Sequence, residues 1–76
     1  MHNKGGEMMI IKMVGLYGIE DQKAYFRKIG DGCFDFVSDK KFASYLKEDE
    51  AKRVMDNKDW YLKQYNAEFI YTIKRG

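Results

Sequence analysis

The sequence has no proline, one cysteine and one histidine among its 76 residues, and these scarcities exclude several kinds of chemistry. A lone cysteine, Cys33, permits no intrachain disulfide and no thiolate cluster for zinc. The only histidine, His2, lies at the amino terminus, so the rest of the chain cannot build a Ser/His, Cys/His or His–metal site. We therefore expect no enzymatic activity, no cofactor and no metal.

The chain also has neither a large net charge nor a long apolar run. Fourteen Lys and Arg residues against twelve Asp and Glu residues leave a net charge of +2, which indicates neither a strong nucleic-acid binder nor an acidic DNA mimic. The longest apolar run, residues 8–11, is far shorter than the roughly 18 residues that span a bilayer. Nothing resembles a signal peptide. We expect a cytoplasmic protein without a membrane partner.

Residues 1–7 are polar, contain two glycines and have no periodicity, so we predict a disordered tail followed by a single domain over residues 8–76. The run Lys4-Gly5-Gly6-Glu7 is what a Gram-positive ribosome-binding site encodes when it is translated in frame. Two explanations stay open: the native start is Met8 or Met9 and the tail is not native, or the run is a chance sequence.

Residues 44–65 are the only segment with a sustained helical period and no glycine or proline. At about 100° per residue, one face carries Ala51, Val54, Met55, Tyr61, Leu62 and Tyr65, which predicts one amphipathic helix. Trp60 falls on the polar face. Either the helix ends near Asn57 and the chain turns Trp60 back onto the core, or the helix continues and Trp60 is exposed.

Four segments have strand patterns, and together with the helix they predict a β-β-β-α-β order. In the first segment, the residues that would point to either face of the sheet are mostly apolar, which is typical of a central strand. Gly30-Asp31-Gly32 predicts a tight hairpin turn between the second and third segments. The segments are residues 8–17, 23–29, 33–37 and 67–74. We predict an α+β domain, a small antiparallel sheet with one amphipathic helix packed on one face.

The alternation within the strands also predicts the core. Phe34 and Phe36 share one face of the third strand, with Asp35 on the other, so we expect both rings to meet the helix. In the closing strand we expect Phe69 and Ile73 to be buried. These four side chains would form one core with Val54 and Met55 of the helix.

Three aspartates recur every four residues, at Asp31, Asp35 and Asp39, but the glycine and terminal glutamate of a calcium loop are missing. We interpret them as turn, strand and cap residues. Cys33 has no base nearby to make a thiolate, so we expect a small buried or half-buried side chain.

The surplus of aromatic residues is the strongest functional signal. Six tyrosines, one tryptophan and five methionines exceed what one small core can bury, and these residue types anchor protein interfaces. We expect Tyr17, Tyr25, Trp60 and Tyr61 to remain partly exposed and to bind a host protein. The same surplus could drive a homodimer through an edge strand.

A second function stays open. Tyr25-Phe26-Arg27-Lys28 interleaves aromatic and basic residues on a strand, and a sheet face that exposes Tyr25 and Arg27 could stack bases and meet phosphates. The ordinary explanation is a strand with Phe26 inside and Arg27 outside. The nucleic-acid alternative is an accessory or regulatory protein.

The pattern of residues 23–73 resembles short proteins of Gram-positive phages. It consists of a Gly-Asp-Gly hairpin, the run Phe34-Asp35-Phe36, the helix start around Glu50-Ala51 and a closing strand through Tyr71. Some small proteins of that origin inhibit host defence, anti-CRISPR proteins among them. The resemblance implies a non-enzymatic protein-binding module of phage or mobile-element origin, with a defence protein such as a CRISPR nuclease as partner, and it assigns no functional residue.

Overall fold

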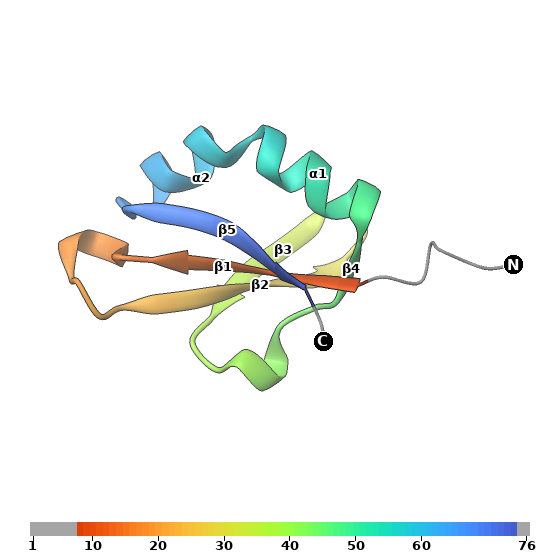
Figure 1. Cartoon of the computed structure of the whole chain (residues 1–76), viewed down its shortest axis with the longest axis horizontal. Coiled ribbons are helices and arrows are strands. Elements are labelled where there is room, and N and C mark those ends of the chain that lie inside the picture. The colour runs from red at the N-terminus through yellow and green to blue at the C-terminus, as the bar shows by residue number, and fades with distance from the viewer. Residues whose placement is uncertain (1–7, 75–76) are drawn as a thin grey trace, which may run out of the picture.

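The chain folds into an α+β structure in which two helices cover one face of an antiparallel sheet (Figure 1). The computed structural model describes residues 8–74, so the predicted tail over residues 1–7 lies outside the described residues. The strands are β1 (Met8–Val14), β2 (Lys23–Gly30), β3 (Cys33–Val37), β4 (Leu46–Lys47) and β5 (Phe69–Lys74); the helices are α1 (Glu48–Asp56) and α2 (Lys58–Gln64); two 3-10 turns are η2 (Leu16–Gly18) and η3 (Lys40–Phe42).

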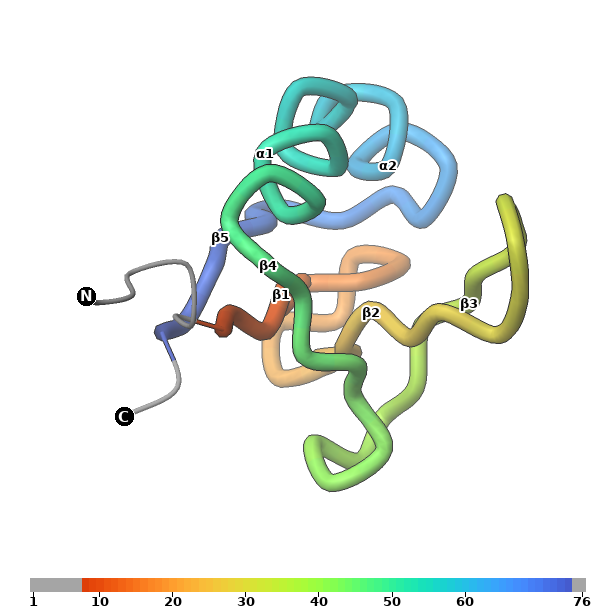
Figure 2. The backbone as a smooth tube through the Cα atoms, turned by 90° about the vertical axis from the view of Figure 1, so that its right-hand side faces the viewer, coloured from red at the N-terminus to blue at the C-terminus, as the bar shows by residue number. Residues whose placement is uncertain are grey.

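β1 is the central strand, as its two apolar rows predict. It pairs antiparallel with β2, β4 and β5. Ile11 and Met13 are buried on the side of the helices, and Ile10 is buried on the opposite side. Figure 2 shows β5 at one side of the sheet and β3 at the other, with the helices above the sheet and the η3 connection below it.

β1 ends at Val14 rather than at residue 17 because Gly15 turns the chain. Gly15 has a φ of 74°, and a Cβ placed on it would lie 2.7 Å from the Cβ of Glu68. Only glycine combines this left-handed conformation with so close an approach. The contact joins the end of β1 to the start of β5.

The β2–β3 hairpin is confirmed. Tyr25 pairs with Val37 and Phe26 with Phe36, and of the three turn residues only Gly32 has a positive φ, 71°. Asp39 caps η3, as expected of this residue, because its Oδ1 accepts a hydrogen bond from the Lys41 N–H at 3.0 Å.

The predicted helix start at residue 44 is wrong, because residues 44–47 run along the sheet. The Ser44 N–H donates to the Phe26 carbonyl at 3.0 Å, and the Ser44 Oγ accepts from the Lys28 N–H at 2.8 Å. β4 then pairs with the first residues of β1. The helix begins only at Glu48, where three acidic residues lie in its positive first turn.

The predicted single helix is divided at Asn57. Asn57 has φ −108° and ψ 22°, which ends α1, and its carbonyl accepts from the Trp60 N–H at 3.0 Å to start α2. A helix end near Asn57 was expected to turn Trp60 onto the core. The helix does break there, but Trp60 stays outside the core. Trp60 is 54% exposed, whereas Tyr61, expected to be exposed, is buried at 8%.

The predicted facing of the closing strand is wrong for Phe69 and Ile73, because Ile73 lies opposite Ile10 on the face away from the helices. Ile70 is buried against the helices, and Phe69 lies on the opposite side of the sheet with 60% of its surface exposed. The register decides this, since Ile70 is opposite Met13, one of the buried β1 residues, and Phe69 is opposite Val14. Phe34, Phe36, Val54 and Met55 pack in or against the core as predicted.

Phe26 is the ring on which the aromatic part of the core is built. Its centroid lies 5.2 Å from that of Phe34, 5.6 Å from that of Phe36 and 6.5 Å from that of Tyr61. These distances and the mostly edge-on angles fall in the favourable range for aromatic pairs. Phe26 therefore couples β2, β3 and α2.

Phe26→Ala should lower the free energy of unfolding by about 3–5 kcal/mol, the usual cost of deleting a buried phenylalanine. Urea denaturation followed by circular dichroism measures it. Phe42→Ala removes an exposed ring and is the matched control, with an expected change within about 0.5 kcal/mol. Equal effects of the two variants would contradict the described core.

Candidate functional site

A row of aromatic side chains from three parts of the chain meets at the surface between α2 and β3. We call Tyr17, Phe34, Phe36, Trp60 and Tyr65 the aromatic face. Phe34, Phe36 and Tyr65 are half-buried, and Trp60 and Tyr17 are exposed, the latter to 61%. The sequence predicted two of these as contact residues, Tyr17 and Trp60, and assigned the two phenylalanines to the core alone.

Ring contacts connect the aromatic face through Tyr61, which lies beneath it. The centroid of Tyr61 is 5.2 Å from Trp60, 5.3 Å from Phe34 and 5.8 Å from Phe36. Phe36 continues the row to Tyr65 at 5.0 Å. Tyr61 is therefore not an exposed contact residue. It is a buried side chain against which the exposed ring of Trp60 packs.

Tyr17 joins the aromatic face at its other end. Its N–H donates to the Tyr65 carbonyl at 3.0 Å, which ties η2 to the end of α2. Burial raises the pKa of Tyr65, and the neighbouring Tyr17 and Asp35 raise it further. Burial also raises the pKa of Tyr61, with Tyr65 contributing. These phenols therefore remain neutral at physiological pH and act as hydrogen-bonding, largely apolar groups.

The backbone of Tyr17 is strained. Its φ of 56° and ψ of 27° lie in the left-handed region, which costs a residue with a Cβ roughly 1–2 kcal/mol. Tyrosine brings no compensating packing here, because most of its side chain is in solvent. Strained backbone of this kind is concentrated at functional sites, so Tyr17 remains a candidate contact residue.

A hollow of about 260 Å³ lies next to the aromatic face, between α1 and the β2–β3 hairpin. Phe26, Phe34, Leu46 and Val54 provide apolar walls. At its rim the Lys28 Nζ bonds the Glu50 Oε2 at 2.8 Å, which raises the pKa of Lys28 and lowers that of Glu50. The recess forms only when α1 packs against the hairpin, so no pattern along the sequence predicts it.

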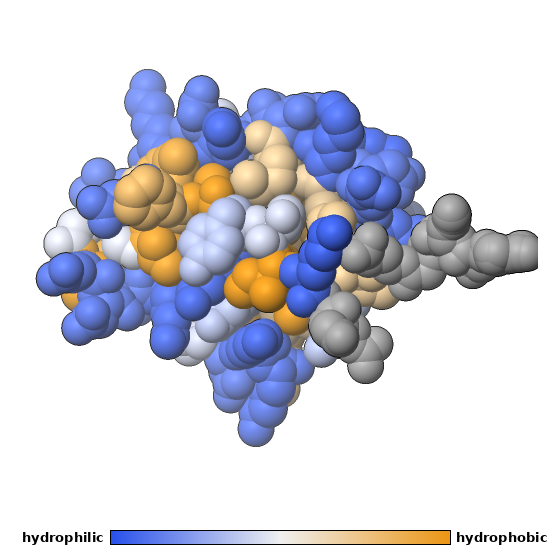
Figure 3. Space-filling view, viewed as in Figure 1, coloured by the Kyte–Doolittle hydropathy of each residue, from blue (hydrophilic) through white to orange (hydrophobic). Residues whose placement is uncertain are grey.

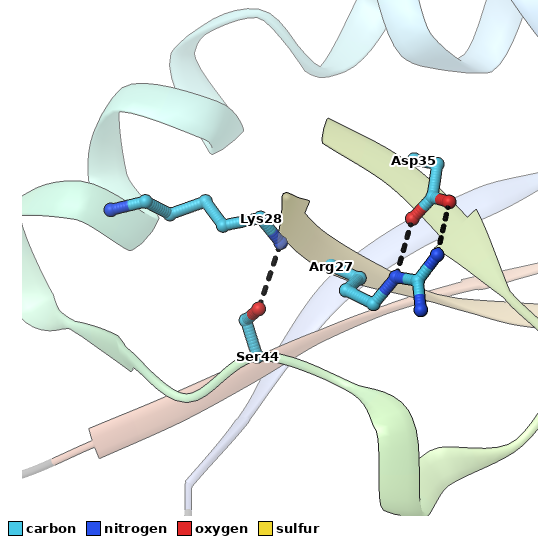
Figure 4. Close-up of polar contacts among 4 residues, drawn as sticks. All are labelled: Arg27, Lys28, Asp35 and Ser44. Carbon is cyan, nitrogen blue, oxygen red and sulfur yellow. Dashed lines mark hydrogen bonds and ion pairs between the residues drawn. The ribbon is translucent and has the colours of Figure 1, made fainter. Parts of the chain in front are cut away.

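Tyr25 and Arg27 do not form the exposed sheet face that the sequence analysis considered. Tyr25 is only 5% exposed, in a small cluster with Ile10 and Ala43. The Arg27 guanidinium bonds both oxygens of Asp35, at 2.9 Å and 2.7 Å (Figure 4). The bonds lower the pKa of Asp35 and raise that of Arg27. The connection through Ser44 covers this face, a tertiary effect that alternation along a strand does not reveal.

The remaining candidate groups are dispersed. Cys33 is exposed, which corrects the expected burial. Within residues 8–74, no three His, Cys, Asp or Glu side chains gather closely enough to hold a metal ion. In the same part of the chain, none of the helices has the length and apolar character needed to cross a bilayer.

Comparison with known proteins gave no match to a family model, a curated protein or a solved structure.

Tyr17→Asn should stabilise the protein by about 1 kcal/mol, because asparagine tolerates the left-handed conformation better than tyrosine. Thermal melting measures the change. A variant that melts several degrees lower would show that the Tyr17 ring holds the fold together, and Tyr17 would then lose its place as a candidate contact residue.

Asp35→Asn should lower the melting temperature at neutral pH but not in acid. The folded-state pKa of Asp35 is depressed by Arg27, so the stabilisation is present above the unfolded pKa of about 4 and is lost as the pH falls through the folded value. The melting temperatures of parent and variant should therefore converge once the pH has fallen below the depressed folded-state pKa of Asp35. In an Arg27→Gln background the pH-dependent difference should disappear; its persistence there would contradict the pairing.

Proposed function

We propose that this chain is a non-enzymatic module that binds another protein through the aromatic face. The exposed Trp60 is the observation that carries the proposal. Its ring is held edge-on against Tyr61 at 5.2 Å, so it is ordered although more than half of it is in solvent. A fixed, exposed tryptophan among half-buried aromatic rings is typical of a binding hot spot, because little conformational entropy is lost on contact.

The surroundings of Trp60 fit a protein partner. The half-buried Phe34, Phe36 and Tyr65 would lose their remaining exposed area in a complex, and the neighbouring recess could receive one apolar side chain of the partner. Charged residues of both signs lie around this region, including Arg53, Lys58, Asp59 and Lys63. An apolar centre with a polar rim is the usual anatomy of a protein interface.

The nucleic-acid alternative has less support from the geometry. Its stacking residue, Tyr25, is buried, and the guanidinium of Arg27 is occupied by both oxygens of Asp35. Binding to bases or phosphates on that face would require the connection over residues 38–45 to move and the ion pair to break. We therefore propose that the functional surface lies on the helix side of the sheet.

The partner that we propose is a cytoplasmic protein of a bacterial host, with this chain encoded by a phage or mobile element. The resemblance of residues 23–73 to short proteins of Gram-positive phages supports that origin. A defence protein such as a CRISPR nuclease is one such partner, and that identity rests on the sequence resemblance alone.

Trp60→Ala should weaken binding to the partner about 30-fold or more while leaving the melting temperature almost unchanged. The immobilised parent chain is used to capture a protein from a Gram-positive bacterial lysate, and affinities of the variants for the purified captured protein are then measured by calorimetry. Phe42→Ala is the matched control, because Phe42 has the same exposed fraction as Trp60, 54%, but lies on η3. The control should bind like the parent.

Fluorescence gives an independent readout, since Trp60 is the only tryptophan. Its emission should resemble that of tryptophan in water for the free chain and shift to the blue in the complex. Equal affinities of Trp60→Ala and the parent would contradict the proposal. Salt-dependent retention of DNA or RNA in place of a protein would favour the nucleic-acid alternative.

A further inference from the structure

The geometry points to a second interaction surface: we infer that two copies of this chain pair antiparallel through their β5 strands. β5 pairs with β1 on one side, and its other side pairs with no strand among residues 8–74. Figure 2 places β5 at the outer side of the sheet. An edge strand offers a row of backbone donors and acceptors to another strand. This inference goes beyond the proposed function and does not depend on it.

β5 lacks the features that usually prevent edge pairing. Proteins protect edges with charged residues, proline, bulges or very short strands. Residues 69–73 of β5 contain no charge and no proline, and the ladder with β1 is regular over six residue pairs. The opposite edge, β3, is different: it is five residues long, carries Asp35 at its centre and pairs with β2 through a register shift between Lys28 and Gly30. Of β3 and β5, β5 is the one open to pairing.

The side chains around this edge form an apolar band. Phe69, Tyr71 and Ile73 point to the sheet face opposite the helices, and Tyr71 is 41% exposed. Figure 3 shows apolar residues gathered over β5 and β1 in the middle of this side of the molecule, with polar residues above them on the helices and below them on the η3 connection. The band thus has a polar rim, as protein interfaces do.

The sequence of β5 is complementary to itself in one register. If Tyr71 faces the second copy's Tyr71 on a two-fold axis, Phe69 lies opposite the second copy's Ile73 on the open face. On the helix face, Ile70 then lies opposite the second copy's Thr72. One residue further out, Glu68 faces the second copy's Lys74, so opposite charges meet at both ends. Directly opposed aromatic, aliphatic and opposite-charge pairs are the contacts that stabilise antiparallel strands.

This self-complementarity identifies the occupant of the edge as a second copy. A two-fold axis makes every contact occur twice, as in most homodimers. The pairing would join the two sheets into one continuous sheet and bury the Phe69 and Tyr71 side chains that the monomer leaves in water. Because β3 lies at the far side of each sheet, both aromatic faces would remain open to a partner.

Charge reversal tests the register. Light scattering with size-exclusion chromatography should show the parent as a monomer of 9.0 kDa at low micromolar concentration and a dimer of twice that mass as the concentration rises. Glu68→Lys and Lys74→Glu should each weaken dimerisation about tenfold, because each places like charges opposite one another twice. The double variant Glu68→Lys/Lys74→Glu should restore it. Circular dichroism verifies that each variant is folded.

Cross-linking tests the two-fold axis. In a Cys33→Ser background, Tyr71→Cys places two thiols on the axis at a Cβ separation of about 4.5–5.5 Å, close to that of a disulfide. A glutathione redox buffer should then give a covalent dimer. Thr72→Cys is the matched control on the same strand and should cross-link far less, since its nearest counterpart lies diagonally across the ladder.

A parent chain that stays monomeric up to millimolar concentration would overturn the inference. So would failure of the double charge variant to recover, or preferential cross-linking of Thr72→Cys. None of these results changes the affinity of the aromatic face for a captured protein, so failure of the dimer and failure of the proposed function are distinguishable.

Discussion

Burial of β1 on both of its faces is the constraint on which the structure depends. A chain of 76 residues has a small core, and Ile11 and Met13 supply its most buried side chains. The helices cover that side, and the connection through Ala43 and Ser44 covers Ile10 on the other. Because this short connection is needed as a lid, residues 44–47 must be extended, and only the residues from Glu48 onward are available for helix.

The way the helices and the connection cover the two faces of β1 determines which aromatic residues stay exposed. The lid buries Tyr25 and leaves little open area on the β2 part of that face. On the helix side, Tyr61 of α2 is buried and Trp60 is left outside, and the rings of Phe34 and Phe36 on β3 stay half-buried. The aromatic face and the apolar edge at β5 are two surfaces that a core of this size leaves uncovered. We propose that the aromatic face binds a different protein and that the β5 edge binds a second copy of this chain.

Local signals in the sequence were sufficient for much of the fold and for less of the site. The hairpin at Gly32 and the two-sided apolar pattern of β1 are set by a few adjacent residues, and both were predicted. The facing of β5 was not, because Phe69 and Ile70 are both apolar and the choice between them depends on the register with β1. The aromatic face combines η2, β3 and α2, so composition indicated surplus aromatic residues without showing which would meet. The left-handed backbone at Tyr17 leaves no mark in the sequence at all.

The most direct test of the central claim, that the aromatic face is the binding surface, is hydrogen–deuterium exchange of the chain alone and in complex with the protein it captures. The account predicts slower exchange in the complex at the backbone amides of β3, α2 and η2, with little change in the connection over residues 38–45. Slower exchange confined to β2 and that connection, with β3, α2 and η2 unaffected, would contradict it.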